Sequence, residues 1–178
     1  MKIKRVWAMP NKWTFTIKPI AELLARYVGD GKGWVDPFAG MTSPAEITND
    51  LNENMEAKYN IDALEFMKAL SPNYFNGVLF DPPYSITQAK ECYNGIGMDK
   101  LNVKPTSMKY WGNIKNEIAR VVKSDGLAIC CGWTSQGIGK GRGFEMLEIL
   151  LVPHGGSKND TIVTVERKIQ AGFNEVEL

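Results

Sequence analysis

Short apolar runs alternate along this chain with stretches in which apolar residues recur at helical spacing. The apolar and β-branched runs predict strands at residues 33–38, 45–50, 59–62, 77–81, 126–132, 146–152 and 161–166. Helical periodicity is clearest at residues 19–27 and 108–122, and a shorter helix is expected at residues 63–70. Strands that alternate with helices predict an α/β fold around an open, mostly parallel sheet, which the last two strands close as an antiparallel hairpin.

Length and composition describe one ordinary folded domain. The 178 residues suffice for a buried core, so we expect a single domain over residues 1–178. Hydrophobic residues make up 44% of the chain and charged residues 23%, as is usual for globular proteins. The sequence has neither an apolar run of membrane-spanning length nor a signal peptide, and its three cysteines show no paired spacing. These features predict a reduced, cytoplasmic setting without contact with a membrane.

The titratable residues exclude several kinds of chemistry. His154 is the single histidine, which leaves almost no material for Cys/His zinc sites or for Ser/His and Cys/His catalysis, and we expect no metal. The formal net charge is +1, so the protein as a whole exerts little attraction on nucleic acid. Any such attraction must come from local groups of basic residues.

The tetrapeptide Asp81-Pro82-Pro83-Tyr84 follows the apolar run at residues 77–80. A strand that ends in an acid, two prolines and an aromatic ring forms a stiff shelf with hydrogen-bond acceptors and a flat stacking face. Chemistry on the exocyclic amine of a nucleobase needs both, because the amine hydrogens need acceptors and the extruded base needs a ring beside it. A proline turn after a strand is the other interpretation, and Tyr84 would then pack beneath the edge of the sheet.

Three further acids stand at the ends of the first three predicted strands, namely Asp36, Asp50 and Asp62. The carboxyl ends of parallel strands meet at one edge of a sheet, where open α/β folds bind ligands. Asp50 is placed to hold the hydroxyls of a ribose, and Asp62 is placed to accept from an adenine amine. Gly40, after the first strand, lets the backbone approach a ligand closely. This rim suits an adenosine moiety, although each acid alone is equally consistent with a helix N-cap.

Two polar segments follow predicted strands, at residues 85–107 and 134–143. Lys140 and Arg142 in the second segment are candidate phosphate contacts, and solvated side chains are the alternative. Further candidates in and beside the first segment are Lys90, Lys100, Lys104 and Lys109. The glycines of the second segment match a nucleotide-triphosphate loop only loosely, because no Lys-Ser/Thr helix start follows them. Trp133 is placed either to flank a target base or to pack in the core.

The segments Thr-Ile-Lys-Pro at 16–19, Asp-Pro-Phe-Ala-Gly at 36–40 and Asp-Pro-Pro-Tyr at 81–84 resemble motifs of the S-adenosylmethionine-dependent amino-methyltransferases of DNA. The carboxyl-terminal segments 131–133 and 159–166 are similar to small phage-type adenine methyltransferases. The resemblance covers roughly residues 14–168 and implies a Rossmann-like methyltransferase sheet. It also implies that S-adenosyl-L-methionine is the cofactor and that DNA is the partner. The implied reaction is methyl transfer to the exocyclic N6 amine of adenine.

The resemblance further implies roles for individual residues. The amine would donate to the Asp81 carboxylate and the Pro82 carbonyl, and the Tyr84 ring would stack on the base. The implied catalytic residues are Asp81, Pro82, Pro83 and Tyr84. The implied cofactor-binding residues are Thr16, Lys18, Asp36, Phe38, Gly40, Asp50, Asp62 and Ala63. Lys140, Arg142 and Trp133 complete the candidate site as substrate contacts.

Two departures from the family pattern bear on the cofactor site. Thr42 stands where the family usually has a second glycine, and residues 41–49 are all that separate Gly40 from Asp50. A parallel crossover usually takes about a dozen residues or more, so we expect the helix after the first strand to be reduced to a turn. Part of the pocket is then expected from a second copy of the chain, in a homodimer, or from a partner subunit.

The sequence leaves other functions open. RNA adenine or guanine, and the N4 amine of cytosine, need the same acceptors and stacking ring as adenine in DNA. A non-catalytic subunit that binds nucleic acid or cofactor is the alternative from another class. The two departures favour it somewhat, and the intact tetrapeptide argues against it. Because no separate target-recognition domain is visible, we expect a relaxed sequence preference, a single-stranded substrate or a dimer.

Overall fold

The computed structural model describes residues 1–84, 88–89, 108–156 and 158–169. Its strands are β1 (Lys2–Arg5), β2 (Trp34–Asp36), β3 (Ile47–Thr48), β4 (Phe75–Phe80), β5 (Val122–Gly132), β6 (Phe144–Val152) and β7 (Thr161–Lys168). Its α-helices are α1 (Lys18–Val28), α2 (Ala63–Ala69) and α4 (Met108–Val121). Short 3₁₀ helices are η1 (Thr14–Thr16) and η3 (Lys140–Arg142).

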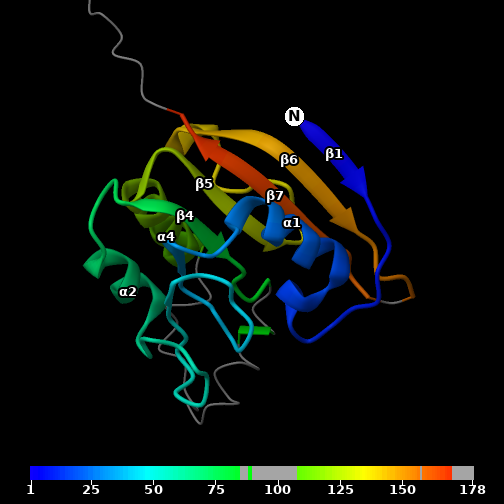
Figure 1. Ribbon diagram of the computed structural model, residues 1–178, viewed down its shortest axis with the longest axis horizontal. Coiled ribbons are helices and arrows are strands. Elements are labelled where there is room, and N and C mark those ends of the chain that lie inside the picture. The colour runs from blue at the N-terminus through cyan, green and yellow to red at the C-terminus, as the bar shows by residue number, and fades with distance from the viewer. Residues whose placement is uncertain (85–87, 90–107, 157, 170–178) are drawn as a thin grey trace, which may run out of the picture.

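Among the described residues the strands form one seven-stranded sheet in the order β1-β6-β7-β5-β4-β2-β3 (Figure 1). Neighbouring strands are parallel except where β7 is involved, since β7 runs antiparallel to both β5 and β6. The predicted α/β sheet, mostly parallel with an antiparallel hairpin near its end, is therefore confirmed.

Helices cover both faces of the sheet. Successive side chains of a strand point to opposite faces, so neighbouring residues of one strand belong to different cores. On β4, Val78 and Phe80 belong to the core that α2 and α4 cover, whereas Leu79 belongs to the core that α1 covers. Figure 1 shows α1 in front of the sheet and α4 behind β4. A central strand covered on both sides explains why residues 77–80 of β4 form a continuous apolar run rather than an alternating one.

The helices begin and end within a residue of their predicted bounds. In the described chain, β2 is followed by β3 without a helix, as the short spacing in the sequence predicts. No helix in that same part of the chain has the length and apolar character needed to cross a membrane.

The structure differs from the sequence prediction at both edges of the sheet. The sequence pattern does not predict β1, because all four of its residues are exposed and carry no apolar alternation. At the opposite edge, β3 has two residues where the pattern predicts a strand over 45–50. Residues 59–62, also predicted as a strand, contribute only the isolated bridge between Tyr59 and Asn49.

Three acids lie where β2, β3 and β4 end. β2 is in parallel register with both neighbours, so the chain leaves all three strands at the same edge of the sheet. Asp36 is the last residue of β2, Asp81 follows β4 directly, and Asp50 follows β3 after one intervening residue. We call the edge that carries Asp36, Asp50 and Asp81 the acid edge.

Candidate active site

Asp81 lies among hydroxyl groups at the end of β4. The Tyr84 hydroxyl donates to Asp81 Oδ1. Burial raises the pKa of the Asp81 carboxyl, and the hydroxyl groups of Tyr84 and Thr14 act in the opposite direction. Sequence neighbourhood brings Asp81 and Tyr84 together, whereas Thr14 comes from η1, far away in the chain.

Tyr84 is half-buried, and its ring meets the Trp133 ring edge to face with centroids 5.8 Å apart. The Tyr84 ring also packs against the core that α1 covers. Trp133, directly after β5, is 39% exposed. The Tyr84 hydroxyl is thus bonded to Asp81, and its ring packs against the core. Trp133 offers a more exposed aromatic face beside it.

Asp36 is fully buried at the end of β2. Its Oδ2 accepts from the Ser43 hydroxyl at 2.6 Å, and its Oδ1 accepts from the Phe38 amide at 2.9 Å. Burial raises the pKa of Asp36 to about 7; these hydrogen bonds oppose the shift, and the negative charges of Asp81 and Asp50 add to it. A cation bound at the acid edge would offset this repulsion and favour the ionised carboxylates.

Asp50 joins the loop after β2 to the loop after β3. Its Oδ2 accepts from the Gly40 amide and its Oδ1 from the Asn52 amide, each at 2.9 Å. Gly40 has a φ of +52°, and a Cβ added there would lie 3.0 Å from the Trp13 ring. Both the backbone conformation and the close approach of Trp13 therefore require glycine at position 40.

Asp62 caps the amino terminus of α2, the alternative that the sequence left open. Its Oδ1 accepts from the amides of Leu64 and Glu65 at 2.9 and 3.1 Å. Its Oδ2 accepts from the Tyr110 hydroxyl at 2.8 Å, and the adjacent Ala63 is buried. Both carboxylate oxygens are engaged by the protein, so an adenine amine would have to share them.

Aromatic side chains of α4 approach the loop after β2. The half-buried Phe38 lies with its ring centroid 5.8 Å from that of Phe80 and 5.9 Å from that of Trp111. Trp111 in turn meets Tyr110, the partner of Asp62, at 5.2 Å. The sequence pattern places Trp111 only on the apolar face of a helix, and nothing in it assigns Tyr110 to the site.

Thr16 and Lys18 are exposed near the start of α1. The Thr16 hydroxyl donates to the Trp13 carbonyl at 2.8 Å. Trp13, whose ring lies against Gly40, thus links this segment to the loop after β2.

The glycine-rich segment 134–143 is folded against β7. The amides of Ile138 and Gly139 donate to the buried Glu166 carboxylate at 2.5 and 2.9 Å. A Cβ added at Gly137 would lie 2.1 Å from Glu166 Oε2. The amide groups that would face an anion in a phosphate-binding loop therefore face a carboxylate of the protein itself.

The two basic residues of that segment lie in η3, which ends just before β6 begins. β6 runs parallel to β5, because both are antiparallel to β7, so its start lies at the amino edge of the sheet, opposite the acid edge. Arg142 Nε donates to Asn116 Oδ1 at 2.7 Å, while Lys140 is exposed. Lys109 is also exposed, on α4. Lys90, Lys100 and Lys104 lie outside the described residues.

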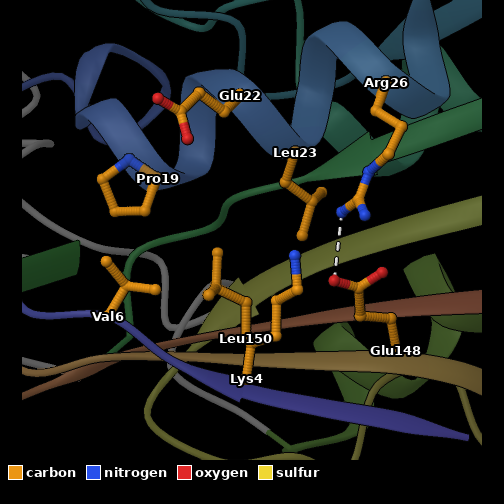
Figure 2. A pocket seen from close by; sticks show the side chains of 8 residues that line it. All are labelled: Lys4, Val6, Pro19, Glu22, Leu23, Arg26, Glu148 and Leu150. Atoms are coloured by element: carbon orange, nitrogen blue, oxygen red, sulfur yellow. Dashed lines mark hydrogen bonds and ion pairs between the residues drawn. The ribbon is translucent and has the colours of Figure 1, made fainter.

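A separate cavity of about 260 Å³ lies between α1 and the strands β1 and β6 (Figure 2). Arg26 forms an ion pair across it with the buried Glu148, at 3.0 Å, and the Tyr27 hydroxyl donates to the same carboxylate at 2.8 Å. Burial acts to raise the pKa of Glu148, but these two partners hold it below its usual value. No residue of the acid edge lines this cavity.

Comparison with known proteins relates the chain to methyltransferases through its fold. No family model and no curated protein matches it. Among solved structures, the 1,6-didemethyltoxoflavin-N1-methyltransferase of Burkholderia thailandensis, with bound S-adenosylhomocysteine, aligns with a TM-score of 0.59 and 12% identity over 86% of this chain and 78% of its own. TrmN from Thermus thermophilus aligns at 0.56 and 14% identity, over 86% of this chain and 49% of its own. The Escherichia coli protein yhhF aligns at 0.52 and 14% identity, over 92% of each chain.

The chain therefore has the Rossmann-like fold of the S-adenosylmethionine-dependent methyltransferases, as the sequence predicts. In open sheets of this kind, ligands bind outside the carboxyl ends of the strands. The acid edge is at that place, and it carries the tetrapeptide at residues 81–84.

Proposed function

We propose that this protein transfers a methyl group from S-adenosylmethionine to the exocyclic N6 amine of adenine in DNA. The observation that carries the proposal is the position of Asp81 at the carboxyl end of β4, beside Asp36 and next to two aromatic rings. Hydrogen-bond acceptors, a stacking face and an edge suited to a cation are the elements that this reaction needs.

The acid edge fits the charge of S-adenosylmethionine, whose sulfonium is a cation that supplies an activated methyl group when bound. The hydrogen bond between Gly40 and Asp50 closes the loop after β2 against the loop after β3, which gives the cofactor a fixed wall. Asp50 keeps unused lone pairs on both oxygens, and these suit the hydroxyls of a ribose. The bound S-adenosylhomocysteine of the Burkholderia enzyme supports the same cofactor here.

Asp81 and the Pro82 carbonyl are the acceptors for the amine. An aromatic amine is a poor nucleophile because its lone pair is delocalised into the ring. Hydrogen bonds from its two hydrogens to fixed acceptors favour a tetrahedral nitrogen and direct the lone pair at the methyl group, so positioning is the main contribution of the protein. Asp81 need not be a strong base, because the amine proton becomes acidic only as the methyl group arrives.

Trp133 is the residue that we expect to stack on the target base. Its ring is more exposed than that of Tyr84, which it contacts. Extrusion of a base from a duplex costs on the order of a few kcal/mol, and stacking on an aromatic side chain returns about 1–3 kcal/mol.

A smaller nitrogen heterocycle is the second candidate substrate. It is favoured by the position of η3, which places Lys140 and Arg142 at the amino edge of the sheet and away from Asp81. A free heterocycle needs the acceptors and the ring but no contact with phosphates.

The proposal is tested by incubating the protein with S-adenosylmethionine labelled in the methyl group and with single-stranded DNA, duplex DNA or RNA, followed by nucleoside analysis. We expect label in N6-methyladenine from DNA. Label in methylated RNA nucleosides or in N4-methylcytosine would mean that the protein methylates a different substrate by the same kind of reaction. If calorimetry detects no binding of S-adenosylmethionine at millimolar concentration, that result would favour a non-catalytic subunit.

A further inference from the structure

β1 forms one edge of the sheet, and its outer side has no neighbouring strand among the described residues (Figure 1). All four residues of β1 are exposed. Directly after β1, the Val6 amide donates to the Leu151 carbonyl of β6 at 2.9 Å. Main-chain groups of successive strand residues point to alternate sides, so those of Ile3 and Arg5 point away from β6. β1 therefore offers main-chain hydrogen bonds to one further strand.

The first three side chains of β1 are basic, apolar and basic. Lys2 is paired with Glu148 and Lys4 with Leu150, so both lysines lie on the face of the sheet that α1 covers. Ile3 lies on the other face and is 59% exposed. In the described part of the chain neither lysine forms an ion pair. A strand that fits this edge carries acids opposite the lysines and an apolar residue opposite Ile3, because opposite charges across a strand pair stabilise it and like charges destabilise it.

The chain contains a sequence that meets these requirements, outside the described residues. Residues 173–178 read Phe-Asn-Glu-Val-Glu-Leu. Aligned antiparallel to residues 1–6, this segment places an apolar residue opposite each apolar residue and an acid opposite each lysine. The pairs are Met1 with Leu178, Lys2 with Glu177, Ile3 with Val176, Lys4 with Glu175, Arg5 with Asn174, and Val6 with Phe173. Parallel alignment keeps the two charge pairs but places Met1 opposite Asn174 and Arg5 opposite Leu178.

The geometry of the sheet excludes this antiparallel pairing within one chain. Ile169, the last described residue, donates its amide to the Gly143 carbonyl, just before β6 begins. Val6 is bonded to Leu151 near the other end of β6, roughly 25 Å further along the sheet. The pairing places Phe173 beside Val6, and the chain from Ile169 to Phe173 spans at most about 14 Å. The segment can therefore reach only the β1 of another copy.

We propose that residues 173–178 of one copy of this chain add an antiparallel strand to the outer edge of β1 in a second copy. Main-chain hydrogen bonds supply affinity in this mode of binding, and the alternating side chains fix the register. Reciprocal exchange between two copies closes a dimer. Direct pairing of two β1 strands about Ile3 is disfavoured, because it would place Lys2 opposite Lys4. The contact does not depend on methyl transfer.

The direct test is charge reversal in the full chain, followed by sedimentation velocity over a range of concentrations. One variant carries Lys2→Glu and Lys4→Glu, and the other carries Glu175→Lys and Glu177→Lys. Each variant alone places like charges across the contact, so the dissociation constant of self-association should rise about tenfold or more. An equimolar mixture of the two variants should associate like the original chain, because each then offers the opposite charges to the other.

Lys109→Glu combined with Lys123→Glu is the matched control, because both lysines are exposed and lie on α4 and β5. This variant should associate like the original chain, and an equal loss in it would show an effect of net charge instead. An original chain that stays monomeric at every concentration, or unchanged association in either charge-reversal variant, would overturn the proposal. Failure of the mixture to associate would overturn it as well, since that result excludes a contact between copies.

Discussion

A buried carboxyl group at position 36 makes the stability of the fold depend on pH. Burial raises the pKa of Asp36 to about 7 in the folded protein, against a usual value of 3.8. Between these two values the native state binds more protons at this site than the unfolded chain. Asp36 therefore contributes stability at low pH, and this contribution is lost as the pH rises through about 7.

Asp36→Asn should remove that dependence. Asparagine cannot ionise, and its side-chain oxygen still accepts from the Phe38 amide. Chemical denaturation at several pH values should show the variant more stable than the original protein above about pH 7, by up to about 4 kcal/mol. Below about pH 4 the two proteins should differ little. Parallel curves across the whole range would mean that folding does not raise the pKa of Asp36.

Trp133 offers a residue-scale test of base stacking. Trp133→Ala should raise the KM for DNA by about 5- to 150-fold, the equivalent of one stacked base, and leave the affinity for S-adenosylmethionine unchanged. Trp133→Phe, which keeps an aromatic face, should retain most of the affinity. An equal loss in both variants would point to packing against Tyr84 as the role of Trp133.

At the residue scale, the sequence predicts Asp81 and Tyr84 as neighbours because they belong to one short motif. It does not predict that the Tyr84 hydroxyl would donate to Asp81, since that depends on how the turn after β4 is folded. The contact of Tyr110 with Asp62 is further from prediction, because Tyr110 comes from α4 and contacts between distant segments leave no local pattern.

At the scale of elements, the Glu166 carboxylate holds the backbone of the segment 134–143 in place. Gly137 has a φ of +55°, and its missing Cβ leaves room for that carboxylate. Gly137→Ala should lower the free energy of unfolding by about 1–3 kcal/mol, from backbone strain and displacement of Glu166. Gly141 has open space around it, so Gly141→Ala is the matched control and should change stability by less than about 0.5 kcal/mol. Equal effects in denaturant titrations would show that Glu166 does not hold the segment.

The elements that could be predicted are those with a strong pattern. The helices show apolar residues at helical spacing, and β4 and β5 show the apolar runs of buried strands. β1 and β3 lie at the edges of the sheet, where a strand needs few buried side chains and so carries little pattern. The orientation of segment 134–143 depends on one buried acid in a later strand, which the glycine spacing alone does not reveal.

At the scale of the whole molecule, the sheet brings together acids that are far apart in the sequence. Asp50 connects two loops at this edge through the Gly40 and Asn52 amides. Asp50→Ala should weaken S-adenosylmethionine binding about tenfold or more in calorimetry, because a charged acceptor and the fixed loop are both lost. Base preference should not change. An unaltered dissociation constant would place the ribose elsewhere.

The central claim is that Asp81 at the end of β4 directs methyl transfer to adenine in DNA. The most direct test is mass spectrometry of nucleosides from the DNA of a host lacking adenine methylation, after expression of the original chain or of Asp81→Ala. The account predicts N6-methyladenine with the original chain and none with Asp81→Ala, while that variant still binds S-adenosylmethionine. No N6-methyladenine in either case, or equal amounts in both, would contradict it.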